Sequence, residues 1–168
     1  MPAVWPNTLD AAEMGWKGSD SEEDISAMAP LYSTRVTAKG GRHGSVRSED
    51  GLLELSLALP KELGGNGGAT NPEQLFAAGY SACFENAVLR VSRESRHHFS
   101  DDQVEVIAEI GLNRNEQGNF VLSASLAVTL AGVDEATADD FVHRAHQICP
   151  YSNAIRGNVD VATTVTVS

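Results

Sequence analysis

One helix with a sharply marked start constrains the fold of this chain more than any other feature. Asn71 is a favoured N-cap residue, Pro72 suits the first helical position, and Gln74 can supply the return arm of a capping box. We expect the helix to continue to about Ser95. It therefore carries Cys83 near its middle.

The segments on either side of this helix alternate between apolar and polar residues, which is typical of strands. Three strands are predicted before the helix, two in a hairpin after it, and one at the end. They cover residues 31–38, 45–48, 52–59, 103–112, 120–130 and 159–167. A second helix is predicted over residues 134–148, with acidic residues in its first turn. This order indicates an α+β fold with helices packed on a largely antiparallel sheet.

Length and charge bound the class of protein. The 168 residues fit one domain, and no apolar run approaches the roughly 18 residues that span a bilayer. The net charge of −11 argues against nucleic acid and membrane surfaces as partners, because binding to phosphate needs clustered lysine and arginine. The start of the sequence lacks the pattern of a signal peptide, so we expect a cytoplasmic location.

Residues 1–30 differ in composition from the rest. They hold six acidic residues against one basic residue, Lys17. A segment of this kind buries little apolar surface, although Trp5 and Trp16 could anchor it. We expect a mobile or loosely docked acidic arm, followed by a folded domain over residues 31–168.

Cys83 and Cys149 are the only cysteines in the chain. In the cytoplasm, a pair of cysteines more often serves as thiols, metal ligands or redox groups than as a permanent disulfide. Cys149 precedes Pro150, which we expect to end the second helix. If the fold brings the two thiols together, a sulfenic acid on Cys83 can condense with Cys149 to a disulfide. A structural pair and a metal site are the alternatives.

A thiol in the middle of a helix needs a cation from elsewhere to become a nucleophile, because the helix dipole acts mainly at the ends. Arg42, in the glycine-rich turn 40–44, is the candidate, and Glu73 could hold its guanidinium. Glu73 precedes Cys83 by ten residues, or about 15 Å along a helix. We therefore predict a homodimer that brings Glu73 of one chain near Cys83 of the other, with the small residues 77–79 at the helix crossing.

Three aromatic residues near the cysteines, Tyr80, Phe84 and Tyr151, could line a substrate cleft. Packing in the core or in an interface explains them equally well. Glu85 lies two residues after Cys83, a separation that turns a side chain about 200° around the helix, so we expect it to face away from the thiol.

The spacing of His143, His146 and Cys149 is a possible metal motif. Residues three apart drift by about 60° per step around a helix, and no fourth ligand is evident. We therefore predict no metal.

Several motifs follow one another in a specific order. They lie at residues 31–32, 40–42, 62–65, 70–84, 149–154 and 156–158, and the last long one reads Cys-Pro-Tyr-Ser-Asn-Ala. Together they resemble the organic hydroperoxide resistance proteins, the Ohr branch of the OsmC/Ohr thiol peroxidases. The resemblance covers roughly residues 31–167.

The resemblance implies roles for four residues. Cys83 matches the peroxidatic cysteine and Cys149 the resolving cysteine, while Arg42 and Glu73 match the pair that holds the reactive thiolate. The implied fold is an intertwined homodimer with two central helices and sites at the interface. Members reduce alkyl and fatty-acid hydroperoxides to alcohols, and dihydrolipoamide or a lipoylated protein reduces the disulfide. No metal or organic cofactor is implied.

Two other functions remain open on the sequence. A non-enzymatic redox sensor or binding protein would oxidise once, whereas an enzyme would cycle with a dithiol. An OsmC-type peroxidase would accept a broader range of peroxides, although the motif at residues 149–154 favours the Ohr branch.

Overall fold

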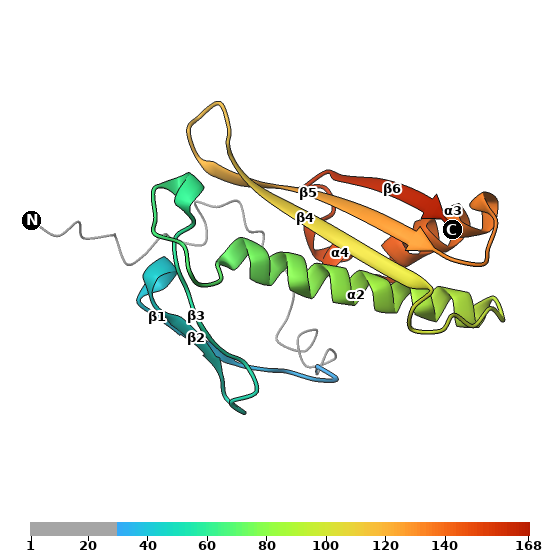
Figure 1. Ribbon diagram of the computed structural model, residues 1–168, viewed down its shortest axis with the longest axis horizontal. Helices are drawn as coiled ribbons and strands as arrows, with labels where there is room; N and C mark the ends of the chain where they lie inside the picture. Colours follow the sequence, from blue (N-terminus) through green and yellow to red (C-terminus); the bar gives the residue numbers. More distant parts are fainter. Residues whose placement is uncertain (1–29) are drawn as a thin grey trace, which may run out of the picture. The chain divides into compact units, whose positions relative to one another are not determined.

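The computed structural model describes residues 30–168, so the arm predicted over residues 1–30 lies, apart from its last residue, outside the described part. The compact unit that carries the two cysteines is Thr37–Ser168. Two three-stranded sheets, three α-helices and two short 3-10 helices make up the regular structure of the described residues (Figure 1). No helix among them is long and apolar enough to cross a membrane.

The first sheet contains β1 (Val36–Lys39), β2 (Ser45–Ser48) and β3 (Glu54–Ser56), in that order. The first and third strands are shorter than predicted. Leu57 still donates its backbone amide to the carbonyl of Gly44, which extends the β2–β3 register by one residue, but Ala58 donates to the carbonyl of Thr70, so the chain changes partner there. The alternating leucines of residues 53–59 predict a strand, but they do not show which segment pairs with it at each residue.

The second sheet has the order β4 (Val104–Arg114), β5 (Phe120–Leu130) and β6 (Val161–Val167). The predicted hairpin of β4 and β5 is confirmed as an antiparallel pair. The last strand, β6, runs parallel to β5. Parallel neighbours need a crossover, and here two helices lie between β5 and β6 in the chain.

The first long helix, α2 (Pro72–Glu94), begins and ends where the sequence predicts. The Asn71 side chain accepts a hydrogen bond of 2.9 Å from the backbone amide of Gln74. The Gln74 side chain accepts a bond from the Thr70 hydroxyl at 2.9 Å, in place of the capping-box return that we expected. The second helix, α3 (Glu135–Ile148), is capped by Asp134 in the same way.

A third helix, α4 (Pro150–Ile155), was not predicted. Pro150 ends α3 as expected, but it also occupies the first position of α4, where a missing N–H costs nothing. The six residues of α4 show too little periodicity to reveal a helix in the sequence.

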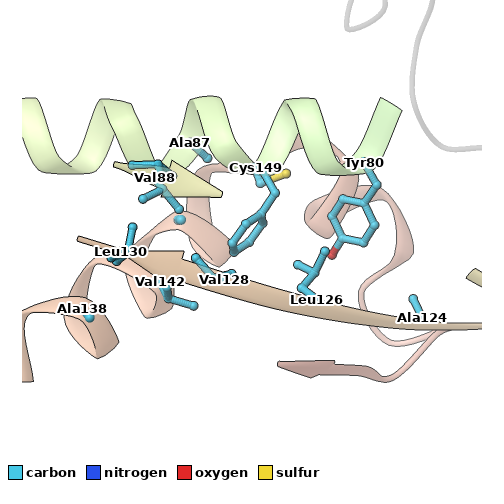
Figure 2. Packing of buried hydrophobic residues seen from close by; sticks show 13 residues of the cluster. Tyr80, Ala87, Val88, Ala124, Leu126, Val128, Leu130, Ala138, Val142 and Cys149 are labelled. Atoms are coloured by element: carbon cyan, nitrogen blue, oxygen red, sulfur yellow. The ribbon is translucent and has the colours of Figure 1, made fainter. Parts of the chain in front are cut away.

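The core lies between the second sheet and the helices α2 and α3. Helix α2 packs against β4 and α3, and its buried face includes Tyr80, Phe84 and Val88. From the sheet, alternate residues of β5 point toward the helices, Leu126 and Val128 among them (Figure 2). This packing sets the position of Cys83, because the residue lies on α2 between Tyr80 and Val88.

We expect Leu126→Ala to lower the free energy of unfolding by about 2–5 kcal/mol, because it leaves a cavity in this core. Leu126 is 1% exposed, whereas Leu122 on the same strand is 36% exposed. Leu122→Ala is therefore the control and should cost well under half as much. Urea denaturation of both variants measures the difference, and equal losses would contradict the assignment of the core.

Candidate thiol active site

The fold brings the two cysteines together. The Cys149 Sγ lies 3.7 Å from the Cys83 Sγ, and both thiols are free. Cys83 is half-buried on α2, while Cys149 is fully buried at the junction of α3 and α4. A disulfide has a bond length of about 2.05 Å, so a small local movement is enough to form one.

Helix α4 also places a backbone amide at Cys83. The N–H of Tyr151, at the second position of α4, hydrogen-bonds the Cys83 sulfur and acts to lower the pKa of the thiol. The same short helix therefore presents both the second thiol and a hydrogen-bond donor to Cys83.

The aromatic ring of Tyr151 fixes how closely α4 approaches α2. It stacks on Tyr80 with 5.9 Å between ring centroids and 17° between planes, and it meets Phe76 edge to face. A Cβ atom on Gly79 would lie 2.6 Å from the Tyr151 hydroxyl, so a side chain at this position would push the ring away. Gly79 therefore has a packing role within the chain, while the predicted helix crossing between chains at residues 77–79 stays a prediction.

Burial raises the pKa of the Cys83 thiol above its ordinary value, and the neighbouring Cys149 raises it further. The Tyr151 amide opposes both effects. Among the described residues of this single chain, no arginine or lysine contributes to the shift. Within residues 30–168 of one chain, the groups that shift the pKa of Cys83 thus do not include the cation that favours a reactive thiolate.

Arg42 and Glu73 form a two-pronged ion pair within the chain. The guanidinium donates to both carboxylate oxygens, at 2.8 and 2.6 Å. Gly40 and Gly41, with φ of 78° and 56°, shape the turn that presents Arg42. The hydrogen bonds from Arg42 lower the pKa of the Glu73 carboxyl, and the same pairing raises the pKa of Arg42.

The pairing of Arg42 with Glu73 follows the sequence-based hypothesis, but the pair does not contact Cys83 in this chain. Glu73 lies in the first turn of α2 and Cys83 in its middle, about 15 Å apart along the axis. The four residues thus form two groups in one chain, a thiol pair and an ion pair, which lie at different positions along helix α2.

The tentative pocket residues differ in their surroundings. Tyr80 and Phe84 are fully buried in the core, whereas Tyr151 is 37% exposed. A hollow of about 500 Å³ beside α3, α4 and β6 is lined by none of these three aromatic residues. Glu85 is half-buried, and it is not among the groups that shift the pKa of Cys83.

The sequence did not reveal the role of two polar residues near the thiols, the buried Ser152 and the half-buried His146. The Ser152 hydroxyl hydrogen-bonds the Tyr80 hydroxyl at 2.9 Å and the His146 Nδ1 at 3.2 Å. His146, which the sequence offered only as a metal candidate, has its other ring nitrogen 3.0 Å from the Thr163 hydroxyl. No cluster of three metal-binding side chains occurs within residues 30–168. The position of Ser152, three residues after Cys149, was the one available signal.

The chain that folds in this way belongs to the OsmC family. The family described as OsmC-like protein matches residues 65–164. Within it, the chain is similar to the organic hydroperoxide resistance proteins. It is 47% identical over 137 residues to organic hydroperoxide resistance protein-like 2 of Staphylococcus epidermidis, covering 81% of this chain and 96% of that one.

Two further comparisons agree. The organic hydroperoxide resistance protein of Xanthomonas axonopodis pv. citri is 43% identical over 136 residues, which covers 80% of this chain and 94% of the relative. A crystal structure of an organic hydroperoxide resistance protein from Legionella pneumophila superposes with a TM-score of 0.79 at 49% identity. It covers 83% of this chain and 100% of that chain.

We expect Glu73→Gln to lower the free energy of unfolding at pH 7 by about 1 kcal/mol, because it removes a charged, partly buried bidentate pair. The Glu73 pKa is lowered from its ordinary value of 4.5, so the stabilisation is present above that value. It is lost as the pH falls through the lowered pKa. Urea denaturation at pH 7 and pH 3 should show the difference shrinking.

The control for this prediction is Glu54→Gln. Glu54 pairs with Arg47 at 3.8 Å, and both side chains are about two-thirds exposed. An exposed pair contributes little, so this variant should change stability by at most a few tenths of a kcal/mol. A loss at Glu73 that did not depend on pH would contradict the ion-pair explanation.

Proposed function

We propose that the chain is a cysteine-based peroxidase that reduces organic hydroperoxides to alcohols. The observation that carries the proposal is the 3.7 Å separation of the Cys83 and Cys149 sulfurs, one part-exposed and one buried. Similarity to organic hydroperoxide resistance proteins supports organic hydroperoxides as the substrates, and within them we propose alkyl and fatty-acid hydroperoxides.

In the first step, the Cys83 thiolate attacks the terminal oxygen of the hydroperoxide. The O–O bond breaks, the oxygen that is transferred keeps its hydrogen, and Cys83 becomes a sulfenic acid. The alkoxide takes up one proton and leaves as the alcohol. A cation beside the breaking bond stabilises the negative charge that develops there.

In the second step, the Cys149 thiol attacks the sulfur of the sulfenic acid, forming the disulfide and releasing water. An external dithiol then restores both thiols by two exchange reactions and itself becomes a disulfide. We propose dihydrolipoamide or a lipoylated protein as this reductant. The cycle balances without a metal or an organic cofactor.

The cation for the first step comes from a second chain in this proposal. Arg42 is held by Glu73 at one end of α2, while Cys83 lies in the middle of the helix with a raised pKa. Two antiparallel α2 helices about a two-fold axis would bring the ion pair of one chain near the thiol of the other. The proposal therefore includes a homodimer with two composite sites.

We expect Cys83→Ser to abolish the reduction of tert-butyl hydroperoxide, because it removes the nucleophile. With one equivalent of hydroperoxide and no added thiol, Cys149→Ser should form about one alcohol per chain and stop at the sulfenic acid, because the Cys83–Cys149 disulfide cannot form. Product analysis and thiol counting measure both, with hydrogen peroxide in parallel as the poorer substrate. Turnover by Cys83→Ser would contradict the proposal.

A subunit-mixing experiment tests the composite site. Arg42→Ala and Cys83→Ser chains, each inactive alone, are refolded together in equal amounts. A mixed dimer would pair Cys83 of the first chain with Arg42 of the second, so random pairing should restore about one quarter of the native activity. No recovery from mixed dimers that are shown to form would contradict a site shared between chains.

A further inference from the structure

A chain of hydrogen bonds links four elements beside the thiol pair. It runs from the Tyr80 hydroxyl on α2 to Ser152 on α4, from Ser152 to His146 on α3, and from His146 to Thr163 on β6. Among these four residues, only Ser152 hydrogen-bonds to side chains of two other helices, Tyr80 on α2 and His146 on α3. Its hydroxyl therefore connects α4 to side chains of both α2 and α3.

The chain of bonds is buried where it meets α4. Tyr80 is fully buried and Ser152 is 5% exposed. Burial lowers the pKa of His146, and Arg156 and His143 act in the same direction, which favours the neutral ring. A buried hydroxyl without a partner costs about 1–3 kcal/mol, so the bonds of Ser152 restrict where α4 can sit.

Helix α4 depends on such contacts because of its length. With six residues it has too few internal hydrogen bonds to be stable alone. Arg156 secures its far end by donating to the His146 carbonyl at 2.6 Å and to Asn153 at 2.9 Å. Near its start, however, Ser152 is the residue that hydrogen-bonds to the side chains of α2 and α3.

Two groups that act on Cys83 are within three residues of Ser152. Cys149 provides the second thiol, and the Tyr151 amide hydrogen-bonds the Cys83 sulfur. A shift of α4 would move both groups at once. A displacement of about 1 Å is enough to slow a reaction between two positioned groups strongly.

We propose that Ser152 is a positioning residue for disulfide formation, which it serves by holding α4 so that Cys149 stays in reach of Cys83. The inference rests on the proposed function. Without Ser152, the hydroperoxide still oxidises Cys83, but condensation with Cys149 slows. The sulfenic acid then meets a second hydroperoxide, which oxidises it to the sulfinic acid and leaves as a second alcohol.

The test compares Ser152→Ala with Ser92→Ala. Ser92 is also buried on a helix, with one hydrogen bond of 2.9 Å to the Leu89 carbonyl, and it has no bond to the chain of residues described above. After mixing with excess cumene hydroperoxide, mass spectrometry follows disulfide and sulfinic acid. We expect Ser152→Ala to form the disulfide about tenfold more slowly, with a matching rise in sulfinic acid. Ser92→Ala should behave as the parent.

A second measurement separates this inference from the proposed function. In a peroxide-free reaction, 2-hydroxyethyl disulfide converts Cys83 to a mixed disulfide, which Cys149 then resolves with release of mercaptoethanol. Ser152→Ala should slow this resolution by a similar factor. If the parent failed to react with hydroperoxides, the proposed function would fall, but the exchange reaction would still test the positioning role.

Tyr80→Phe provides an independent variant, because it removes one hydroxyl and keeps the ring on Tyr151. We expect it to slow resolution less than Ser152→Ala, and the double variant to be no slower than Ser152→Ala alone. Urea denaturation shows whether each variant is folded. Resolution at the parental rate in Tyr80→Phe and in Ser152→Ala, without added sulfinic acid, would overturn the inference.

Discussion

The packing of α2 against the β4–β6 sheet is the interaction on which the rest of this structure depends. The buried face of α2, which includes residues from Tyr80 to Val91, supplies one side of the core, and β5 supplies the other. Because Cys83 lies within that same stretch, the position of its sulfur is set by core packing. A thiol on a loop would not be held in this way.

Helix α2 also separates two kinds of chemistry. Its first turn holds a carboxylate that accepts two hydrogen bonds from an arginine, and its middle holds a half-buried thiol at the edge of the apolar core. Each arrangement is stable by itself, since the charges are paired and the thiol is neutral. In the proposed homodimer, the arginine of one chain would come close to the thiol of the other and make it reactive. A dimer would do this without placing an unpaired charge in the core of the single chain.

Much of the fold could be predicted from local patterns. Asn71 and Pro72 mark the start of α2, Asp134 marks the start of α3, and alternation identifies the β4–β5 hairpin. The pairing of Arg42 with Glu73 was also expected, because a guanidinium in a glycine-rich turn needs a carboxylate to fix it. These features depend on residues that are neighbours in the chain or on strong charge complementarity.

The surroundings of the thiols could not be predicted in the same way. Tyr80 and Ser152 are 72 residues apart, and nothing in the local sequence of either indicates the other. Gly79 shows why a small residue is ambiguous, since its role within the chain becomes clear only when Tyr151 is placed beside it. The parallel pairing of β6 with β5 likewise follows from the crossover through α3 and α4.

The 66-residue separation of the cysteines has a consequence for the energetics of the whole domain. A bond between them would close a loop that contains β4, β5 and α3, which form most of the core. In the chain-entropy description, such a crosslink destabilises the unfolded state by about 4 kcal/mol. Oxidation would thus leave the domain harder to unfold, by heat or by a protease, than the reduced form. Resistance to unfolding would then report the redox state of the protein.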